Sequence, residues 1–119
     1  MCCIDDVIAI EGLEDFQVGF NPALTGPIPK EFGKLARLKR IYAWNASLTS
    51  VPAELGDLPS LLAVDLTDNA LEGSLPSSLS KLSTVNTAYF DGNENLKCPV
   101  SAEVESWLHG VPYHAEPCP

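Results

Sequence analysis

Apolar and polar positions repeat along this chain with a period of 23 to 25 residues. Taking Leu13, Leu38, Leu61 and Val85 as the first residues of successive coils, the intervals are 25 residues (13 to 38), 23 (38 to 61) and 24 (61 to 85). Each interval contains a leucine, a short polar link, an apolar residue and a proline, followed by apolar residues three apart. Repeats of this length are typical of solenoids, in which each coil packs only against its neighbours.

The coil that spans residues 61–84 indicates which positions face the core. Val64 and Leu66 alternate with the polar residues Asp65 and Thr67, which predicts a half-buried strand. Farther along, the apolar spacing widens to about three, which favours a tight, partly helical return leg. We expect these side chains to point inward: Leu61, Val64, Leu66, Leu71, Leu75, Leu79 and Leu82. One coil cannot bury them alone, so the pattern predicts a stack of coils with a continuous core.

The segment Leu61–Pro76, LLAVDLTDNALEGSLP, resembles the plant-type leucine-rich repeat, L-x-x-L-x-L-x-x-N-x-L-x-G-x-I-P. The segment Asn21–Pro29, NPALTGPIP, is a second match with one extra residue after the asparagine. The resemblance implies an α/β solenoid with parallel strands on its concave face, short helical or 3-10 return legs and a C-terminal cap. Repeats of this kind occur in plant receptor ectodomains, in polygalacturonase-inhibiting proteins, and in many algal and protist proteins.

The resemblance also implies an internal ladder of asparagines. In the family, the repeat asparagine points inward and hydrogen-bonds the backbone of the neighbouring coil. Asn21, Asn69 and Asn93 match that position, but the second coil has Ala46 there. We therefore expect an interrupted ladder, in which backbone groups near Ala46 need water or an altered turn.

We predict one domain over residues 1–119, with a partial upstream coil (1–12), the repeats (13–96) and a C-terminal cap (97–119). A solenoid end without a cap exposes its core. The upstream end is therefore expected to be covered by a partner or by missing sequence.

Two features of the first residues bear on that upstream end. Val7, Ile8 and Ile10 belong to a coil with no complete predecessor, so they are expected to form a contact surface. Cys2 and Cys3 are either a remnant of the cysteine-containing segment that precedes such repeats or unpaired thiols at a frayed end.

The C-terminal cap carries its own signals. The sequence NLKCP followed by Cys118 resembles the family's cysteine-containing cap, which implies a disulfide between Cys98 and Cys118. Residues 101–108 predict a short amphipathic helix with Ser101 as its N-cap and Gly110 as its stop. Its apolar side is expected to consist of Val104, Trp107 and Leu108.

The charge of the chain narrows the choice of partners. The formal net charge is -9 and the sequence pI is near 4.4, which disfavours nucleic acid and anionic membrane surfaces as partners. No apolar run is long enough to span a bilayer, and no signal peptide is visible. A disulfide-tied cap suits an oxidising compartment, so we expect a secreted, extracellular or organelle-lumenal protein.

The strand residues beside the inward positions should face outward on the concave sheet. Tyr42 and Trp44 lie two residues apart on one strand and are expected to form an exposed aromatic pair, with Tyr89 two coils along. Arg40 and Asp65 should lie at the edge of this pair. Grouped aromatics favour a binding surface, although they would also serve simply to shield the sheet.

The coil register places Glu14 beside Lys39 and Asp15 beside Arg40. These pairs would form either a polar recognition strip or ordinary cross-strand ion pairs, and the second interpretation is favoured because solvated ion pairs are common.

Other candidate sites are weak. Asn45 opens an Asn-Ala-Ser glycosylation sequon, and a glycan there would lie beside Trp44. Scattered acidic residues more often stay solvated than bind calcium, so we expect no metal ion and no cofactor. No catalytic set emerges, and His109 is expected only to favour the helix dipole. The acidic and histidine residues considered were Asp65, Asp68, Asp91, His109 and His114.

The favoured function is a non-catalytic module that recognises a protein, or a glycan, through the concave face. The alternative is a structural or accessory subunit docked in a larger multiprotein complex, organellar or membrane-associated. The aromatic pair supports the first function, and the uncapped upstream end supports the second.

Overall fold

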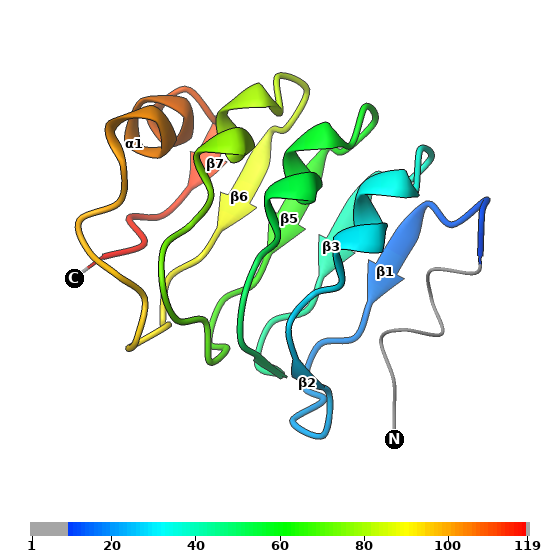
Figure 1. Cartoon of the computed structure of the whole chain (residues 1–119), viewed down its shortest axis with the longest axis horizontal. Coiled ribbons are helices and arrows are strands. Elements are labelled where there is room, and N and C mark those ends of the chain that lie inside the picture. Colours follow the sequence, from blue (N-terminus) through cyan, green and yellow to red (C-terminus); the bar gives the residue numbers. More distant parts are fainter. Residues whose placement is uncertain (1–9, 119) are drawn as a thin grey trace.

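The computed structural model describes residues 10–118, and the expected contact surface at Val7 and Ile8, like Cys2 and Cys3, lies outside them. Five parallel strands form one sheet in the order β1-β3-β5-β6-β7, so each coil adds its strand beside the previous one (Figure 1). The strands are β1 (Asp15–Gln17), β3 (Arg40–Tyr42), β5 (Ala63–Asp65), β6 (Thr87–Tyr89) and β7 (Tyr113–His114). A second, two-stranded sheet joins β2 (Thr25–Gly26) to β4 (Ser47–Leu48).

The return legs form the second layer, which lies in front of the sheet in Figure 1. They are the 3-10 helices η2 (Lys30–Lys34), η3 (Ala53–Asp57) and η4 (Ser77–Lys81). Each begins directly after a proline with extended backbone, because a fixed φ suits the first turn of a helix. The legs stack closely: a Cβ at Gly33 would lie 2.6 Å from the carbonyl oxygen of Glu54 in the next leg. The expected 3-10 return legs are thus confirmed.

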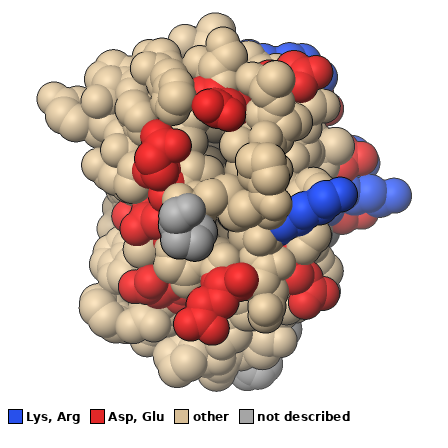
Figure 2. Space-filling view, turned by 90° about the vertical axis from the view of Figure 1, so that its left-hand side faces the viewer, with Lys and Arg blue, Asp and Glu red and all other residues tan. Residues whose placement is uncertain are grey.

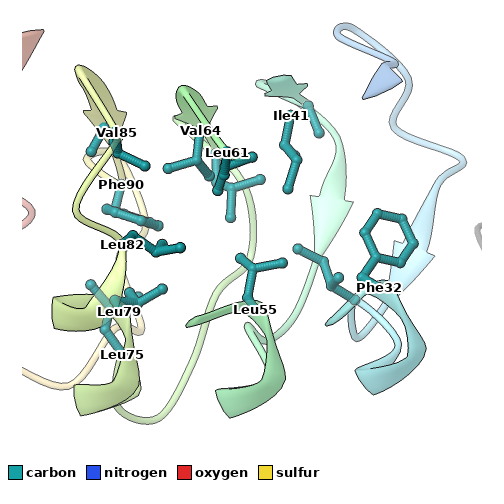
Figure 3. Packing of buried hydrophobic residues seen from close by; sticks show 14 of the residues in the cluster. Phe32, Ile41, Leu55, Leu61, Val64, Leu75, Leu79, Leu82, Val85 and Phe90 are labelled. Atoms are coloured by element: carbon teal, nitrogen blue, oxygen red, sulfur yellow. The ribbon is translucent and has the colours of Figure 1, made fainter. Parts of the chain in front are cut away.

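The core fills the space between the sheet and the return legs (Figure 3). All seven side chains of the third coil that were expected to point inward are buried. Phe32 in η2 and Phe90 after β6 are the largest of the fully enclosed side chains in this core. The core runs without a break from coil to coil, which is the expected consequence of stacking.

The asparagine ladder is present in one half of the stack. Asn93 is buried, its Oδ1 accepts from the backbone N–H groups of Asn69 and Leu71, and its Nδ2 donates to three backbone carbonyls. Asn69 forms the equivalent contacts, accepting from the N–H of Leu48 and donating to the carbonyl of Ala43 among others.

The first coil does not continue this ladder. The expectation for Asn21 was wrong, because its side chain is exposed and donates to no backbone group of the described residues. At the position next to Ala46, the Ser47 hydroxyl donates to the carbonyl of Pro22 at 2.9 Å, and β2 pairs with β4. These contacts join the first and second coils where the asparagine is missing.

The C-terminal cap has the expected helix and disulfide. Helix α1 (Ala102–His109) begins at Ser101, whose hydroxyl accepts from the N–H of Val104, and it ends at Gly110. Cys98 and Cys118 are joined by a disulfide. The cap also supplies β7, which pairs with β6 and was not predicted.

Among residues 10–118, no helix has the length and apolar character that crossing a membrane requires.

Candidate functional site

The strand register arranges the outward side chains in rows across the sheet. Gln17, Tyr42, Asp65 and Tyr89 occupy one row on β1, β3, β5 and β6. Continuing the register by two residues gives a second row, made of Gly19, Trp44, Thr67 and Asp91. We call the surface formed by these two rows the outer sheet face; it corresponds to the concave face expected from the sequence.

Three aromatic side chains meet at the upstream end of this face. The rings of Tyr42 and Trp44 are 6.3 Å apart and those of Phe20 and Trp44 are 5.9 Å apart, both in edge-to-face arrangements. We call Phe20, Tyr42 and Trp44 the aromatic cluster. The expectation that Tyr42 and Trp44 are exposed was wrong, because both are half-buried. Phe20, in contrast, is 70% exposed.

The position of Trp44 depends on a glycine in the neighbouring coil. A Cβ at Gly19 would lie 2.6 Å from the indole ring of Trp44, so the ring can rest on the β1 side only because no side chain is there. This packing explains the half-burial of Trp44. Removing its side chain should therefore lower the stability of the fold as well as any binding.

Phe20 has an unusual backbone conformation. Its φ is 58°, in the left-handed region that a bulky side chain rarely adopts. The same repeat position is held by Asn45, Asp68 and Gly92, which are residue types that tolerate a positive φ. The Phe20 side chain fills no core space, and the coil-to-coil bond at this position is made by its backbone N–H to the carbonyl of Trp44. Neither feature of the fold therefore requires a phenylalanine here. Sequence reasoning missed Phe20, but aligning the turn positions of the coils would have found it.

Tyr89 and Asp65 continue the face toward the C-terminal end. Asp65 lies between Tyr42 and Tyr89 in their row, and its Oδ1 accepts from the N–H of Thr67 at 3.0 Å. Tyr89 is half-buried, and among the described residues it makes no ring contact with the aromatic cluster. Asp91 follows in the second row, with its Oδ1 3.4 Å from the Thr67 hydroxyl. The face is thus aromatic at one end and acidic toward the other.

The two expected ion pairs are present at the upstream rim. Lys39 Nζ lies 3.3 Å from Glu14 Oε1, and an Arg40 guanidinium nitrogen lies 2.8 Å from Asp15 Oδ1. The hydrogen bond and charge of Asp15 raise the pKa of Arg40. All four side chains are substantially exposed to solvent, so these pairs contribute little to stability.

The remaining sequence candidates are separated from one another. Asn45, the sequon asparagine, is exposed and has a left-handed backbone in the turn that follows β3, directly after Trp44. The three aspartates considered for calcium do not converge: among residues 10–118, the group of side chains close enough to share a metal ion consists of His109, His114 and Glu116.

No protein-family model matches the sequence, and no curated protein matches it. Solved structures do match. The leucine-rich-repeat ectodomain of the Arabidopsis thaliana membrane receptor kinase GASSHO1/SCHENGEN3 is 31% identical, with a TM-score of 0.78 over 87% of this chain and 12% of that one.

Two further structures have the same fold. The ectodomain complex of the Arabidopsis receptor kinase HAESA is 22% identical, with a TM-score of 0.76 over 91% of this chain and 18% of that one. A leucine-rich-repeat protein of Leptospira interrogans is 33% identical, with a TM-score of 0.58 over 68% of this chain and 20% of that one. This chain therefore spans a fifth or less of the length of each of these three proteins.

Proposed function

This chain is a leucine-rich-repeat protein of the plant type, and from that premise we propose that its outer sheet face binds an extended segment of a partner protein. The proposal is for a non-catalytic recognition module. The observation that carries it is the aromatic cluster, and Phe20 above all.

Phe20 is costly in the free chain. A left-handed backbone at a bulky residue destabilises the fold by about 1–2 kcal/mol, and its side chain is largely exposed. An exposed aromatic held in this way, beside two half-buried aromatics, is the arrangement expected of an anchor for an apolar side chain. Trp44 and Tyr42 would form the sides of the contact and Phe20 its exposed edge.

The acidic end of the outer sheet face gives the proposed partner a second property. Asp65 and Asp91 lie one and two strands downstream of the aromatic cluster, and each carboxylate uses only one oxygen in the hydrogen bonds that the structure describes. Neither forms a salt bridge with a described lysine or arginine. We therefore propose a partner segment with an apolar residue on the aromatic cluster and basic residues over the two aspartates. Arg40 and Tyr89 would border this contact.

The structural neighbours make a peptide-like partner reasonable. HAESA was solved in complex with the peptide hormone IDA and the co-receptor SERK1, and GASSHO1/SCHENGEN3 in complex with CASPARIAN STRIP INTEGRITY FACTOR 2. Those ligands belong to those proteins. For this chain we propose only the class, a protein segment, in an extracellular or other oxidising compartment that maintains the Cys98–Cys118 disulfide.

The test is selection from a random peptide library displayed on phage, with the full chain as the target. Selected peptides should combine an aromatic or aliphatic residue with lysine or arginine. Phe20→Asn should weaken their binding by about tenfold or more, since anchors cost more than about 1.4 kcal/mol when truncated. Asn suits the left-handed backbone, so this variant should fold at least as well as the parent.

Tyr113→Ala is the matched control. Tyr113 is also an exposed aromatic, 64% accessible, but it lies on β7 at the far end of the sheet. Its removal should leave binding unchanged. If the selected peptides bind Phe20→Asn as tightly as the parent, or if their binding depends on Tyr113 instead, the aromatic cluster is not the recognition site.

A further inference from the structure

Three side chains with metal-ligating chemistry meet in the C-terminal cap, remote from the aromatic cluster. They are His109 at the end of α1, His114 in β7, and Glu116 in the tail that follows. His109 Nε2 lies 3.2 Å from Glu116 Oε2, and His114 Nε2 lies 4.0 Å from the same oxygen. We propose that this His–His–Glu group binds a divalent transition-metal ion of the zinc type.

The hydrogen bond of His114 determines which nitrogen is available. Its Nδ1 lies 2.8 Å from the carbonyl oxygen of Val111, so Nδ1 carries the proton and donates it. In a neutral imidazole the other nitrogen, Nε2, then holds a lone pair, and it faces the carboxylate oxygen of Glu116. Two acceptors that face each other are stabilised by a cation between them, or by a water molecule that donates to both. A carbonyl that orients a histidine through its second nitrogen is also the usual support of a metal-binding histidine.

The spacing fits a small tetrahedral ion after modest side-chain adjustment. One ligand atom from each residue can be chosen so that all three lie within 4.8 Å of one another. In a tetrahedral zinc site with bonds of about 2.0–2.1 Å, neighbouring ligand atoms are about 3.3 Å apart. His109 Nε2 and Glu116 Oε2 are already at that separation, and His114 Nε2 needs to approach Glu116 Oε2 by less than about 1 Å.

The disulfide of the cap fastens one of the three segments. Cys118 is tied to Cys98, so the tail that carries Glu116 is fastened two residues beyond it.

Glu105 lies one turn before His109 on the same side of α1, and it lines a hollow of about 100 Å³ together with His109 and Glu116. That hollow has room for water, so either a water molecule or Glu105 would complete a fourth position.

The charge around the group also favours a cation. Residues 91–118 contain five carboxylates and a single lysine: Asp91, Glu94, Glu103, Glu105, Glu116 and Lys97. Figure 2 looks onto this end of the molecule, where acidic groups are spread over the face and the basic side chains lie at its right-hand edge. Imidazole nitrogens select zinc, copper or nickel over magnesium and calcium, which prefer oxygen ligands alone.

The experiment is calorimetric titration of zinc chloride into the full chain, purified without a histidine tag. One zinc ion should bind per chain, and magnesium chloride should give no signal. The same titration of a chain with Cys2→Ser and Cys3→Ser should be unchanged, which excludes binding by those two residues.

Three variants remove one ligand each. His109→Ala and Glu116→Gln alter exposed side chains, and His114→Asn keeps a donor for the Val111 carbonyl while it removes Nε2. Each should weaken zinc binding by about tenfold or more. Glu103→Gln, which changes an exposed carboxylate on the same helix, is the matched control and should leave the affinity unaltered.

The alternative is that a proton is the only cation that the group takes up. If the parent chain gives no zinc signal, or if zinc still binds with unchanged affinity after His109→Ala or Glu116→Gln, the group is an ion-pair cluster and the proposal is wrong. Nitrogen chemical shifts of the two imidazoles provide the second readout, because zinc at this site must shift Nε2 of both histidines.

Discussion

The two ends of this solenoid have the same backbone plan but are held together differently. Asn69 bonds the backbone of the second coil from the third, and Asn93 bonds the backbone of the third coil from the fourth. Between the first and second coils, Ala46 leaves the ladder incomplete and an exterior bridge from Ser47 replaces it. The aromatic cluster lies at this junction between the first and second coils. The comparison indicates that the ladder is complete in the downstream half, and that departures from the repeat accumulate where we propose recognition.

The largest expected effect is loss of the downstream ladder. Asn93→Ala removes a buried side chain that takes part in five hydrogen bonds with backbone groups, so it should lower the free energy of unfolding by about 3 kcal/mol. Urea denaturation measures this. Asn21→Ala, at the same repeat position but exposed, should change it by less than about 0.5 kcal/mol. Equal losses in the two variants would mean that the two junctions are not different.

The next largest effect should come from the cap. Cys98→Ser with Cys118→Ser opens a loop closed across 20 residues, and the chain-entropy model gives a loss of about 3 kcal/mol. Comparing urea denaturation of this variant with that of the parent under non-reducing conditions measures it. If stability were unchanged, the packing of α1 against the last return leg would suffice to hold the cap.

The upstream junction should respond to a single methyl group. Gly19→Ala places a Cβ against the Trp44 indole, so the ring must move or the two coils must separate. We expect a loss of about 1–2 kcal/mol from this overpacking. Thermal denaturation followed by circular dichroism checks the stability. Gly12→Ala, where an added Cβ meets no neighbour, is the control and should be close to neutral.

The smallest effect has the opposite sign. Phe20→Asn relieves a left-handed backbone worth about 1–2 kcal/mol and loses an edge-to-face ring contact worth about 0.5–1.5 kcal/mol, so the free energy of unfolding should rise by about 0.5 kcal/mol. Chemical denaturation on the same preparation used for peptide binding would test it. A clear loss of stability would show that Phe20 supports the fold, which would remove the main reason to place an anchor there.

The sequence predicted the parts of the molecule that periodicity controls. An offset of 25 residues placed Asp15 beside Arg40, and the same spacing identified the buried leucines, because coil length determines strand register. The half-burial of Trp44 depends instead on a missing side chain in another coil, which no single repeat reveals. The grouping of His109 with Glu116 depends on the path of the tail after β7. That strand has only two residues, too few to show an alternating pattern.

The two tryptophans of this chain lie at opposite ends of the stack, and Trp107 belongs to the C-terminal cap. Its indole N–H donates to the carbonyl of Leu82, so its surroundings change if the cap detaches from the last return leg. Trp44 reports on the opposite end of the stack, and the sequence contains no other tryptophan. Because a linear array can open from one end before the other, the two natural fluorophores make the order of opening observable without labels. Replacing either by phenylalanine leaves a single reporter, and the lag between the two signals measures how strongly neighbouring coils melt together.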